Sequence, residues 1–284
     1  MIIDFHTHIF PEKIAERTIS ALASSSTSRP HTNGTEEGLI SAMKSSGVSL
    51  SVNLPVLTKP SQIDSILSFG KEINRKYTSE IKRILSSGEK SEDCSEAILS
   101  FAGIHPCDES PEEHLELIKE MGFLGIKIHP DYQGTYFDDE KYIRILSMAK
   151  KLDLITVTHA GIDGAFPNQP IKCTPTRVLR ALDKLGGYEK LVLAHLGGGK
   201  VENEVYELLA GESIYFDTAY LLTLVDKSHI TRILEKHSED KILFATDSPW
   251  SEATRDLNVI KSLGLSKSCE DKILSGNALN LLSK

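Results

Sequence analysis

The feature that most constrains the fold is a regular alternation of short apolar runs with longer amphipathic stretches. Each apolar run is rich in β-branched residues, as a strand requires, and is followed by a segment with helical periodicity. The eight runs fall at residues 2–6, 50–56, 98–104, 123–129, 154–159, 191–195, 214–218 and 242–247. Strands that alternate with helices pair in parallel through right-handed crossovers, so the pattern predicts an α/β fold.

Two α/β architectures compete for this pattern. Eight strand–helix units in 284 residues fit one (β/α)8 TIM barrel, which we expect to occupy residues 1–284 as a single domain. The rival is a doubly wound open sheet, which normally carries a glycine-rich phosphate-binding turn after an early strand. Gly197-Gly198-Gly199 follows the sixth expected strand instead, so the barrel is the better prediction.

Composition excludes several classes of function. The formal charge is −8, from 32 basic and 40 acidic residues, which argues against nucleic acid or an anionic membrane as the main partner. No apolar run approaches the roughly 18 residues of a membrane span, and the N-terminus lacks the pattern of a signal peptide. The four cysteines form no CxxC pair, so we expect a reduced, cytoplasmic protein that acts on a small molecule. A homodimer or higher homo-oligomer is compatible with this composition.

The first strand–helix unit contains a long insertion. Residues 11–34 follow the first strand and include a serine-rich stretch before Arg29-Pro30. In a barrel this segment leaves the C-terminal ends of the strands, where active sites are built. We therefore expect a mobile lid over the mouth, with Arg29 or His31 near the substrate, although a solvated insertion or a subunit contact would use the same composition. A second polar stretch, 86–96, is expected to be an exposed loop on the opposite face.

Histidines are concentrated at the ends of the expected strands. Of the ten histidines, six lie at or just past a strand C-terminus, as does one aspartate. These residues are His6, His8, His105, His129, His159, His195 and Asp247. Because the strand ends of a barrel converge on one mouth, we expect these side chains to meet there. The remaining four, expected at the surface, are His31, His114, His229 and His237.

His6-Thr7-His8 is the sharpest local signal. Residues i and i+2 of a strand share one side, so both imidazoles can face the barrel axis and bind one divalent metal. His159 and His195 each end an apolar strand, and small residues that leave space beside the ring follow both. Asp247 ends a buried run, where a carboxylate is costly without a metal or cationic partner. Helix capping by Asp247 is the alternative.

Five short motifs run in order along nearly the whole chain. They are Asp4-Phe5-His6-Thr7-His8, Gly125-Ile126-Lys127-Ile128-His129-Pro130, Val157-Thr158-His159-Ala160-Gly161, Leu193-Ala194-His195-Leu196-Gly197-Gly198 and Thr246-Asp247-Ser248-Pro249-Trp250. Together they resemble the amidohydrolase superfamily, and within it the branch of metal-dependent hydrolases related to aminocarboxymuconate-semialdehyde decarboxylase. The segment 273–282 resembles the closing helix of that branch.

The resemblance implies a ligand set and a catalytic pair. His6, His8, His159 and Asp247 match residues that bind one divalent metal, and three imidazoles with one carboxylate suit zinc. Asp247 matches a ligand that also touches the catalytic water. His195 matches a histidine that hydrogen-bonds the water or the substrate without binding the metal. The expected catalytic residues are therefore His195 and Asp247.

Lys127 leaves a second arrangement open. In other branches of the superfamily a carboxylated lysine on this strand bridges two metals, and His159 and His195 would then hold the second ion. One metal is favoured, because the residues around Lys127 resemble the one-metal branch. The residues expected to contact substrate are Arg29, His105, Lys127 and His129.

The ligand set does not separate hydrolysis from decarboxylation. A decarboxylase of an unsaturated or aromatic acid needs a cation for the carboxylate, and Arg29 is the one arginine that the sequence places near the mouth. Hydrolysis of an ester, lactone or amide by a metal-activated water therefore ranks first, and nonoxidative decarboxylation second. A non-catalytic metal-binding module is disfavoured, because the ligand set is complete and His195 is present.

Overall fold

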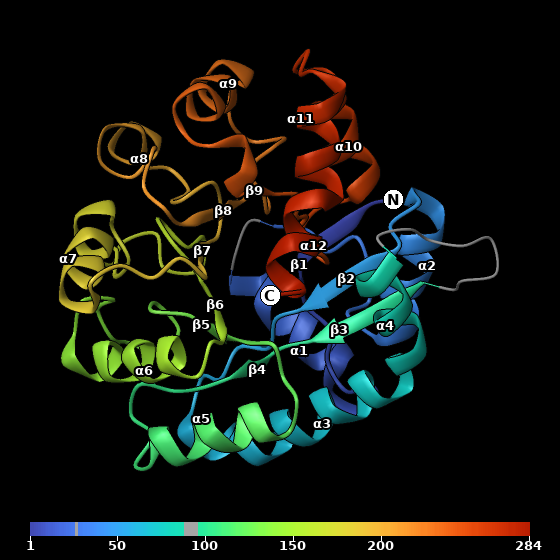
Figure 1. The fold of residues 1–284 in the computed structure, drawn as a ribbon. Coiled ribbons are helices and arrows are strands. Elements are labelled where there is room, and N and C mark those ends of the chain that lie inside the picture. Colours follow the sequence, from blue (N-terminus) through green and yellow to red (C-terminus); the bar gives the residue numbers. More distant parts are fainter. Residues whose placement is uncertain (26–27, 88–95) are drawn as a thin grey trace.

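Parallel strands form a central ring, and helices surround it (Figure 1). The computed structural model describes residues 1–25, 28–87 and 96–284, and its strands all pair in parallel. They are β1 (Ile3–Thr7), β2 (Leu50–Asn53), β3 (Ala97–Ser100), β4 (Ala102–Gly103), β5 (Gly125–Ile128), β6 (Ile155–Thr158), β7 (Leu191–Leu193), β8 (Tyr215–Asp217) and β9 (Ile242–Leu243). Each corresponds to a strand expected from the sequence.

The strand order follows the chain, as a barrel requires. One sheet has the order β1-β2-β3 and the other runs from β4 to β9. Only Phe101 separates β3 from β4, so these two are halves of the expected strand 98–104. Backbone hydrogen bonds from Phe5 N to Phe244 O (2.9 Å) and from Asp247 N to His6 O (2.8 Å) join the last strand to the first. These bonds close the ring, and the (β/α)8 prediction is confirmed.

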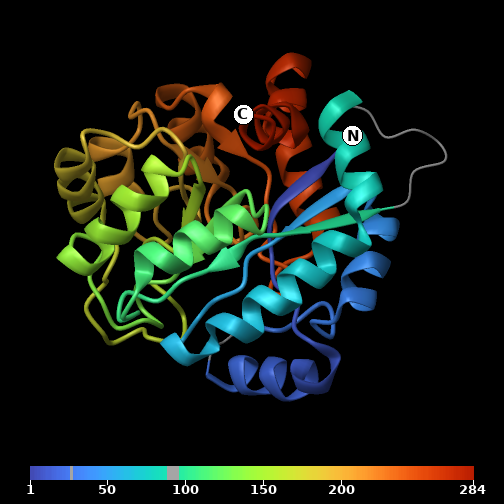
Figure 2. The same cartoon turned by 60° about the horizontal axis from the view of Figure 1, so that its bottom comes forward.

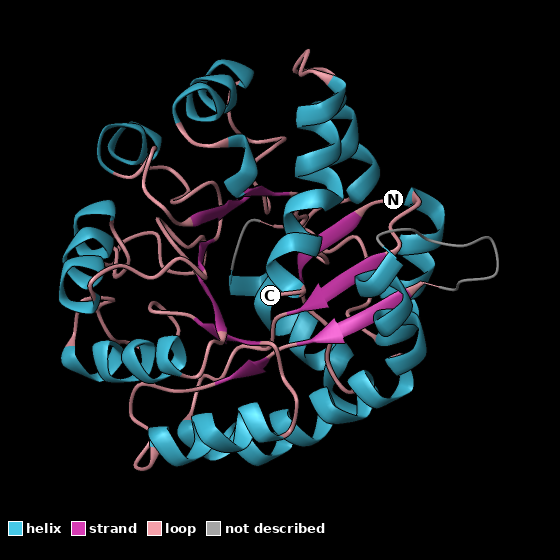
Figure 3. Ribbon diagram, viewed as in Figure 1, coloured by secondary structure: helices cyan, strands magenta, loops and turns pink. Residues whose placement is uncertain are grey.

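Helices flank the outside of the ring (Figure 3). They are α1 (Glu12–Ser25), α2 (Glu36–Ser46), α3 (Ile63–Lys76), α4 (Thr78–Ser87), α5 (Pro111–Glu120), α6 (Glu140–Lys151), α7 (Pro175–Leu185), α8 (Glu202–Leu208), α9 (Lys227–Lys236), α10 (Ala253–Lys261), α11 (Lys267–Asp271) and α12 (Asn277–Leu282). Three shorter turns are Pro60–Gln62, Glu239–Lys241 and Lys272–Gly276. No helix in the described ranges is long and apolar enough to cross a membrane.

Local sequence explains where these helices begin and end, as α7 illustrates. The Thr174 side chain accepts a hydrogen bond from the Arg177 N–H, and Pro175 occupies the first turn. Gly186 then ends the helix in the left-handed conformation, at φ 61°. The apolar face of the helix packs Val178 into the main hydrophobic core with residues of the neighbouring strands.

The segment 11–34 is more ordered than the sequence suggested, because α1 occupies much of it. α1 lies apart from the other helices, at the lower edge of Figure 2. Beyond it, the Ser28 and Tyr220 hydroxyls are 2.6 Å apart, and the Ser25 side chain hydrogen-bonds Tyr132. Tyr132 and Tyr220 follow β5 and β8, so the segment reaches from β1 across the mouth of the barrel. Residues 26–27 and most of the stretch 86–96 lie outside the described residues.

Candidate metal centre

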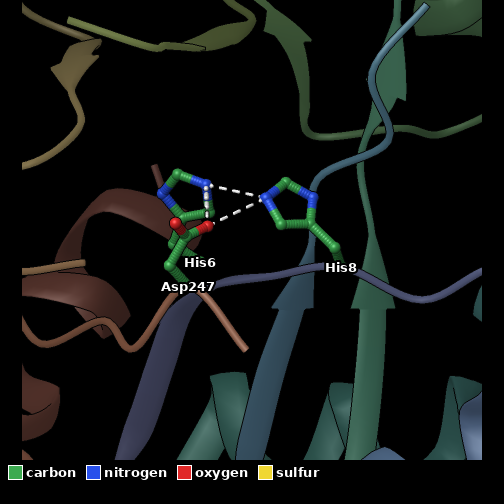
Figure 4. Close-up of side chains that lie close together, drawn as sticks. All are labelled: His6, His8 and Asp247. Carbon is green, nitrogen blue, oxygen red and sulfur yellow. Dashed lines mark hydrogen bonds and ion pairs between the residues drawn. The ribbon is translucent and has the colours of Figure 1, made fainter. Parts of the chain in front are cut away.

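Three of the expected ligands meet at the C-terminal end of the barrel. His6 lies on β1, His8 directly follows it, and Asp247 follows β9 (Figure 4). The Nε2 atoms of His6 and His8 are 3.2 Å apart, and Asp247 Oδ1 lies 3.0 Å from His8 Nε2 and 3.4 Å from His6 Nε2. We call these three residues the metal group. Their convergence was the central expectation from the strand-end pattern.

The hydrogen bonds behind the rings fix which nitrogens carry protons. His6 Nδ1 lies 2.8 Å from Asp217 Oδ2, and His8 Nδ1 lies 2.8 Å from the Leu54 carbonyl. Both partners only accept, so both Nδ1 atoms donate, and in the neutral form that binds a metal each ring then presents a lone pair at Nε2. Two lone pairs and the Asp247 carboxylate oxygen therefore face one another. A group made of acceptors alone requires a cation, and a divalent metal with N and O ligands fits it.

Electrostatics favour the protonation states that a metal needs. Burial, followed by the charge of Lys127, holds the pKa of His6 well below its usual value, so the imidazole is neutral. Burial alone would raise the pKa of Asp247, but a proton on His6 or His8 beside it stabilises the ionised carboxylate, and the net effect is a lowered pKa. Lys127 Nζ donates to His6 Nε2 at 3.0 Å, and burial lowers the lysine pKa to about 8.

His195, the expected proton-transfer residue, lies beside the metal group. Its ring centroid is 5.7 Å from that of His6. His195 Nδ1 donates to the Ala219 carbonyl at 2.9 Å, so Nε2 accepts the proton on His159 Nδ1 at 2.9 Å. The backbone at His195 is left-handed, with φ 60°, and this conformation turns the ring toward the mouth. The structure thus places an acceptor nitrogen of His195 next to the ligands.

His159, the expected fourth ligand, lies outside the metal group. With Nδ1 bonded to His195, the His159 ring directs Nε2 toward Asp131 Oδ2, 3.9 Å away. Both of these atoms are buried and have no hydrogen-bond partner within the described chain. The Nε2 lone pair of His159 is therefore free, but it faces the Asp131 side of the mouth. Ligation of the same ion requires the ring to turn.

A second set of side chains lies on this side of the mouth. His129 stacks on His159 with ring centroids 4.3 Å apart, and its Nε2 lies 3.3 Å from Asp163 Oδ2. The Tyr132 N–H approaches His129 Nδ1 at 3.4 Å, which leaves the proton on Nε2 for Asp163. Phe166 packs edge-on against Tyr132, with centroids 5.0 Å apart. His129 therefore belongs to an aromatic and acidic wall next to the metal group.

The other expected substrate contacts lie further out. His105 is buried, but its Nδ1 accepts the Cys107 N–H at 3.0 Å, so it stabilises its own turn. Arg29 and His31 are exposed. The His31 N–H donates to the Pro249 carbonyl at 2.7 Å, which ties the end of the 11–34 segment to the loop after Asp247. The structure does not bring Arg29 to the ligands.

Three acidic residues at the site escaped the sequence analysis. Asp217 ends β8, where its Oδ2 holds His6 and its Oδ1 accepts the His195 N–H at 3.0 Å. A carboxylate at the end of the buried run 214–218 was the signal that could have found it. Asp131 and Asp163 lie in the loops after β5 and β6, where acidic residues are common and carry no periodic signal.

His237 and Asp247 differ in how they fit the expectations from the sequence. The surface assignment is wrong for His237, which is buried, stacks on Phe216 at 4.0 Å and hydrogen-bonds the Ile214 carbonyl at 3.0 Å. Its place on an amphipathic helix end hid this role. The helix-capping alternative for Asp247 is not supported, because within the described residues its side chain pairs with imidazoles.

Several solved structures share this fold. The structure superposes on an uncharacterized TIM-barrel protein from Bordetella bronchiseptica with a TM-score of 0.71 at 14% identity, covering 99% of this chain and 98% of that chain. It superposes on 5-carboxyvanillate decarboxylase from Sphingomonas paucimobilis with a TM-score of 0.65 at 14% identity, covering 99% of this chain and 98% of that chain. A third structure is dihydroxybenzoic acid decarboxylase from Polaromonas, solved with manganese. Its TM-score is 0.63 at 16% identity, and the match covers 99% of this chain and 96% of that chain. These likenesses establish the shared fold.

Sequence comparison identifies the family. No curated protein sequence matches the chain. The amidohydrolase family model matches residues 3–284, which is nearly the full length and includes all five motifs. The chain therefore belongs to the amidohydrolase family.

Proposed function

We propose that the protein is a metal-dependent nonoxidative decarboxylase, a carboxy-lyase, of an unsaturated or aromatic carboxylic acid. The metal group at the mouth of the barrel, with His195 beside it, supports metal-dependent chemistry, and the likeness in fold to decarboxylases of aromatic acids favours decarboxylation. Decarboxylases of aromatic acids are among the proteins with a similar fold, and two of those structures contain manganese. This support reverses the ranking from the sequence, which placed hydrolysis first.

His6, His8 and Asp247 would hold the ion. His159 is the proposed fourth ligand, and it would reach the ion by turning its ring away from His195. Zinc is the ion expected from three imidazoles and one carboxylate, while manganese suits the same mixed donors. When bound, the ion polarises a substrate oxygen and so eases loss of the neighbouring carboxylate.

The residues of this chain supply binding and proton transfer. In decarboxylation the carbon that bears the carboxylate takes up a proton, the bond to the carboxylate breaks, its electron pair returns to the carbon skeleton, and CO2 leaves. In this structure His195 Nε2 accepts the proton on His159 Nδ1. With His159 turned toward the ion, His195 Nε2 would be free to take up and release the proton of the reaction. Asp247, ionised within the metal group, is the other candidate for proton transfer.

Hydrolysis of an ester, lactone or amide is the second candidate. It is favoured by the carboxylates on one wall of the mouth, which would repel an anionic substrate. Burial and the neighbouring Asp163 raise the pKa of Asp131 to about 6, which still lies below neutral pH, so Asp131 adds negative charge to this wall at pH 7. A neutral substrate would not meet this repulsion.

A substrate screen distinguishes the two reactions. Protein loaded with Mn²⁺ or Zn²⁺ is incubated with aromatic and unsaturated carboxylic acids, and separately with esters, lactones and amides. We expect CO2 release from an acid, with loss of activity after chelation and in His8→Ala. Hydrolysis without CO2 release from any acid would establish the second candidate. A cytoplasmic location, a small-molecule substrate without nucleic-acid or membrane partners, and a homo-oligomeric state remain predictions.

A further inference from the structure

Lys127 is a buried cation whose bonding capacity is largely unused. Its side chain, on β5, is 1% exposed at the centre of the site. Its ammonium donates to His6 Nε2 at 3.0 Å, and across the described residues it forms no other hydrogen bond and no ion pair within 4.0 Å. An ammonium carries three N–H donors, so two of them have no partner in the described chain. Burying such a charge is costly unless an anion accompanies it.

The nearest carboxylates are already committed to other groups. Asp217 uses both oxygens, for the His6 ring and for the His195 and Ala219 N–H groups. Asp247 pairs with His8 within the metal group. These acids attract the ammonium at longer range, but neither supplies a direct partner. The Lys127 ammonium can therefore donate hydrogen bonds to an anion that is not part of the described chain.

The bond between Lys127 and His6 also conflicts with metal binding. His6 gives its Nδ1 proton to Asp217, so Nε2 has a single lone pair. That lone pair now accepts from the ammonium, and it is the same lone pair that a metal ligand must donate. The ammonium and the ion cannot both use it.

We propose that Lys127 binds the carboxylate of the substrate, and that metal binding at His6 releases it for this role. The ammonium lies 3.0 Å from His6 Nε2, one of the acceptor atoms that an ion would use. Once an ion holds His6, the freed ammonium offers its donors to an anion beside the metal, as charge-assisted hydrogen bonds. This inference rests on the proposed metal centre, and it assigns to Lys127 the cationic role that the sequence left to Arg29.

Replacing Lys127 with methionine tests both halves of the proposal. The probes are Mn²⁺ and benzoate, an aromatic carboxylate without a reactive substituent. The apo Lys127→Met protein should bind Mn²⁺ about tenfold or more tightly than wild type, because a competing and repelling cation is gone. The Mn²⁺-loaded variant should bind benzoate roughly 10–100-fold more weakly, because a charged hydrogen bond is lost. The proposal therefore predicts that the same variant binds Mn²⁺ more tightly and benzoate more weakly than wild type.

Two further variants control the measurement. Lys127→Gln should behave like Lys127→Met and covers the case in which the methionine variant does not fold. Lys190→Met removes a lysine directly before β7. This lysine pairs with Asp153 at 2.7 Å, away from the metal group, so both affinities should stay unchanged. Thermal unfolding and circular dichroism check that each variant is folded.

Three results would overturn the proposal. Unchanged benzoate affinity in both Lys127 variants would remove the anion-binding role. Loss of Mn²⁺ in these variants, restored by bicarbonate or acetate, would instead make Lys127 a carboxylated ligand that bridges two metals. Failure of the wild-type protein to bind Mn²⁺ would contradict the metal centre itself, and with it the release of Lys127.

Discussion

Replacement of Asp217 by asparagine should weaken metal binding without removing a ligand. The carboxylate accepts from three donors: His6 Nδ1 at 2.8 Å, the His195 N–H at 3.0 Å and the Ala219 N–H at 3.1 Å. Asparagine has one oxygen and one NH2 group, so one orientation points a donor at His6 and the other points a donor at the backbone N–H groups. If the NH2 group faces His6, the ring must move its proton to Nε2, where it blocks the metal.

The expected loss follows from that mismatch. Partners that orient a ligating histidine typically contribute 10–100-fold to metal affinity, which corresponds to ~1.4–2.7 kcal/mol. Mn²⁺ titration by calorimetry measures this loss, and nitrogen NMR of the His6 ring reports its tautomer. Asp153→Asn is the matched control, since Asp153 is exposed and pairs with Lys190 at 2.7 Å away from the metal group. Unchanged Mn²⁺ affinity in Asp217→Asn, with His6 still protonated at Nδ1, would refute the tautomer argument.

Three further predictions concern other parts of the structure. His195→Ala should keep one metal per chain and lower kcat by ~10²–10⁴-fold, as loss of a general acid–base does; parallel loss of a metal ion would favour the two-metal site. Tyr220→Phe removes the hydroxyl that meets Ser28, and should raise KM with unchanged metal content if the 11–34 segment closes the mouth; unaltered kinetics would leave that segment a surface insertion or an interface. Burial raises the pKa of Asp256 from 3.8, the value expected in the unfolded chain, to about 7 in the folded protein. The protonated carboxyl therefore stabilises the fold fully below about pH 4, and this contribution is lost as the pH rises through 7. Asp256→Asn should therefore be more stable than wild type by up to about 4 kcal/mol at pH 8, with the difference shrinking toward pH 4 in denaturant titrations; equal pH profiles would contradict this.

The sequence predicts those parts of the structure that follow from a repeating pattern of strands and helices. Apolar runs with β-branched residues located the strands, and a barrel brings all strand C-termini to one mouth. The convergence of His6, His8 and Asp247 follows from those two facts alone. The break at Phe101 lies inside the continuous apolar run 98–104, which carries no local signal for it.

The parts that sequence missed depend on side-chain direction and on pairing across the barrel. The strand pattern places His159 at the mouth but cannot tell whether its ring faces the metal group or Asp131. Asp217 is recognisable as functional only once β8 is known to lie beside His6 and His195. Residues 12–25 form α1, but the serine-rich stretch that follows them favours a loop, so the sequence pattern does not mark this helix.

The most direct test of the account is to locate the bound ion. Crystals of the protein soaked in Mn²⁺ allow the ion to be placed by anomalous scattering. The account predicts one ion per chain, bonded to Nε2 of His6, Nε2 of His8 and the Asp247 carboxylate at about 2.0–2.2 Å, with Lys127 Nζ no longer on His6. An ion bound elsewhere, or no ion at these three side chains at saturating Mn²⁺, would contradict it.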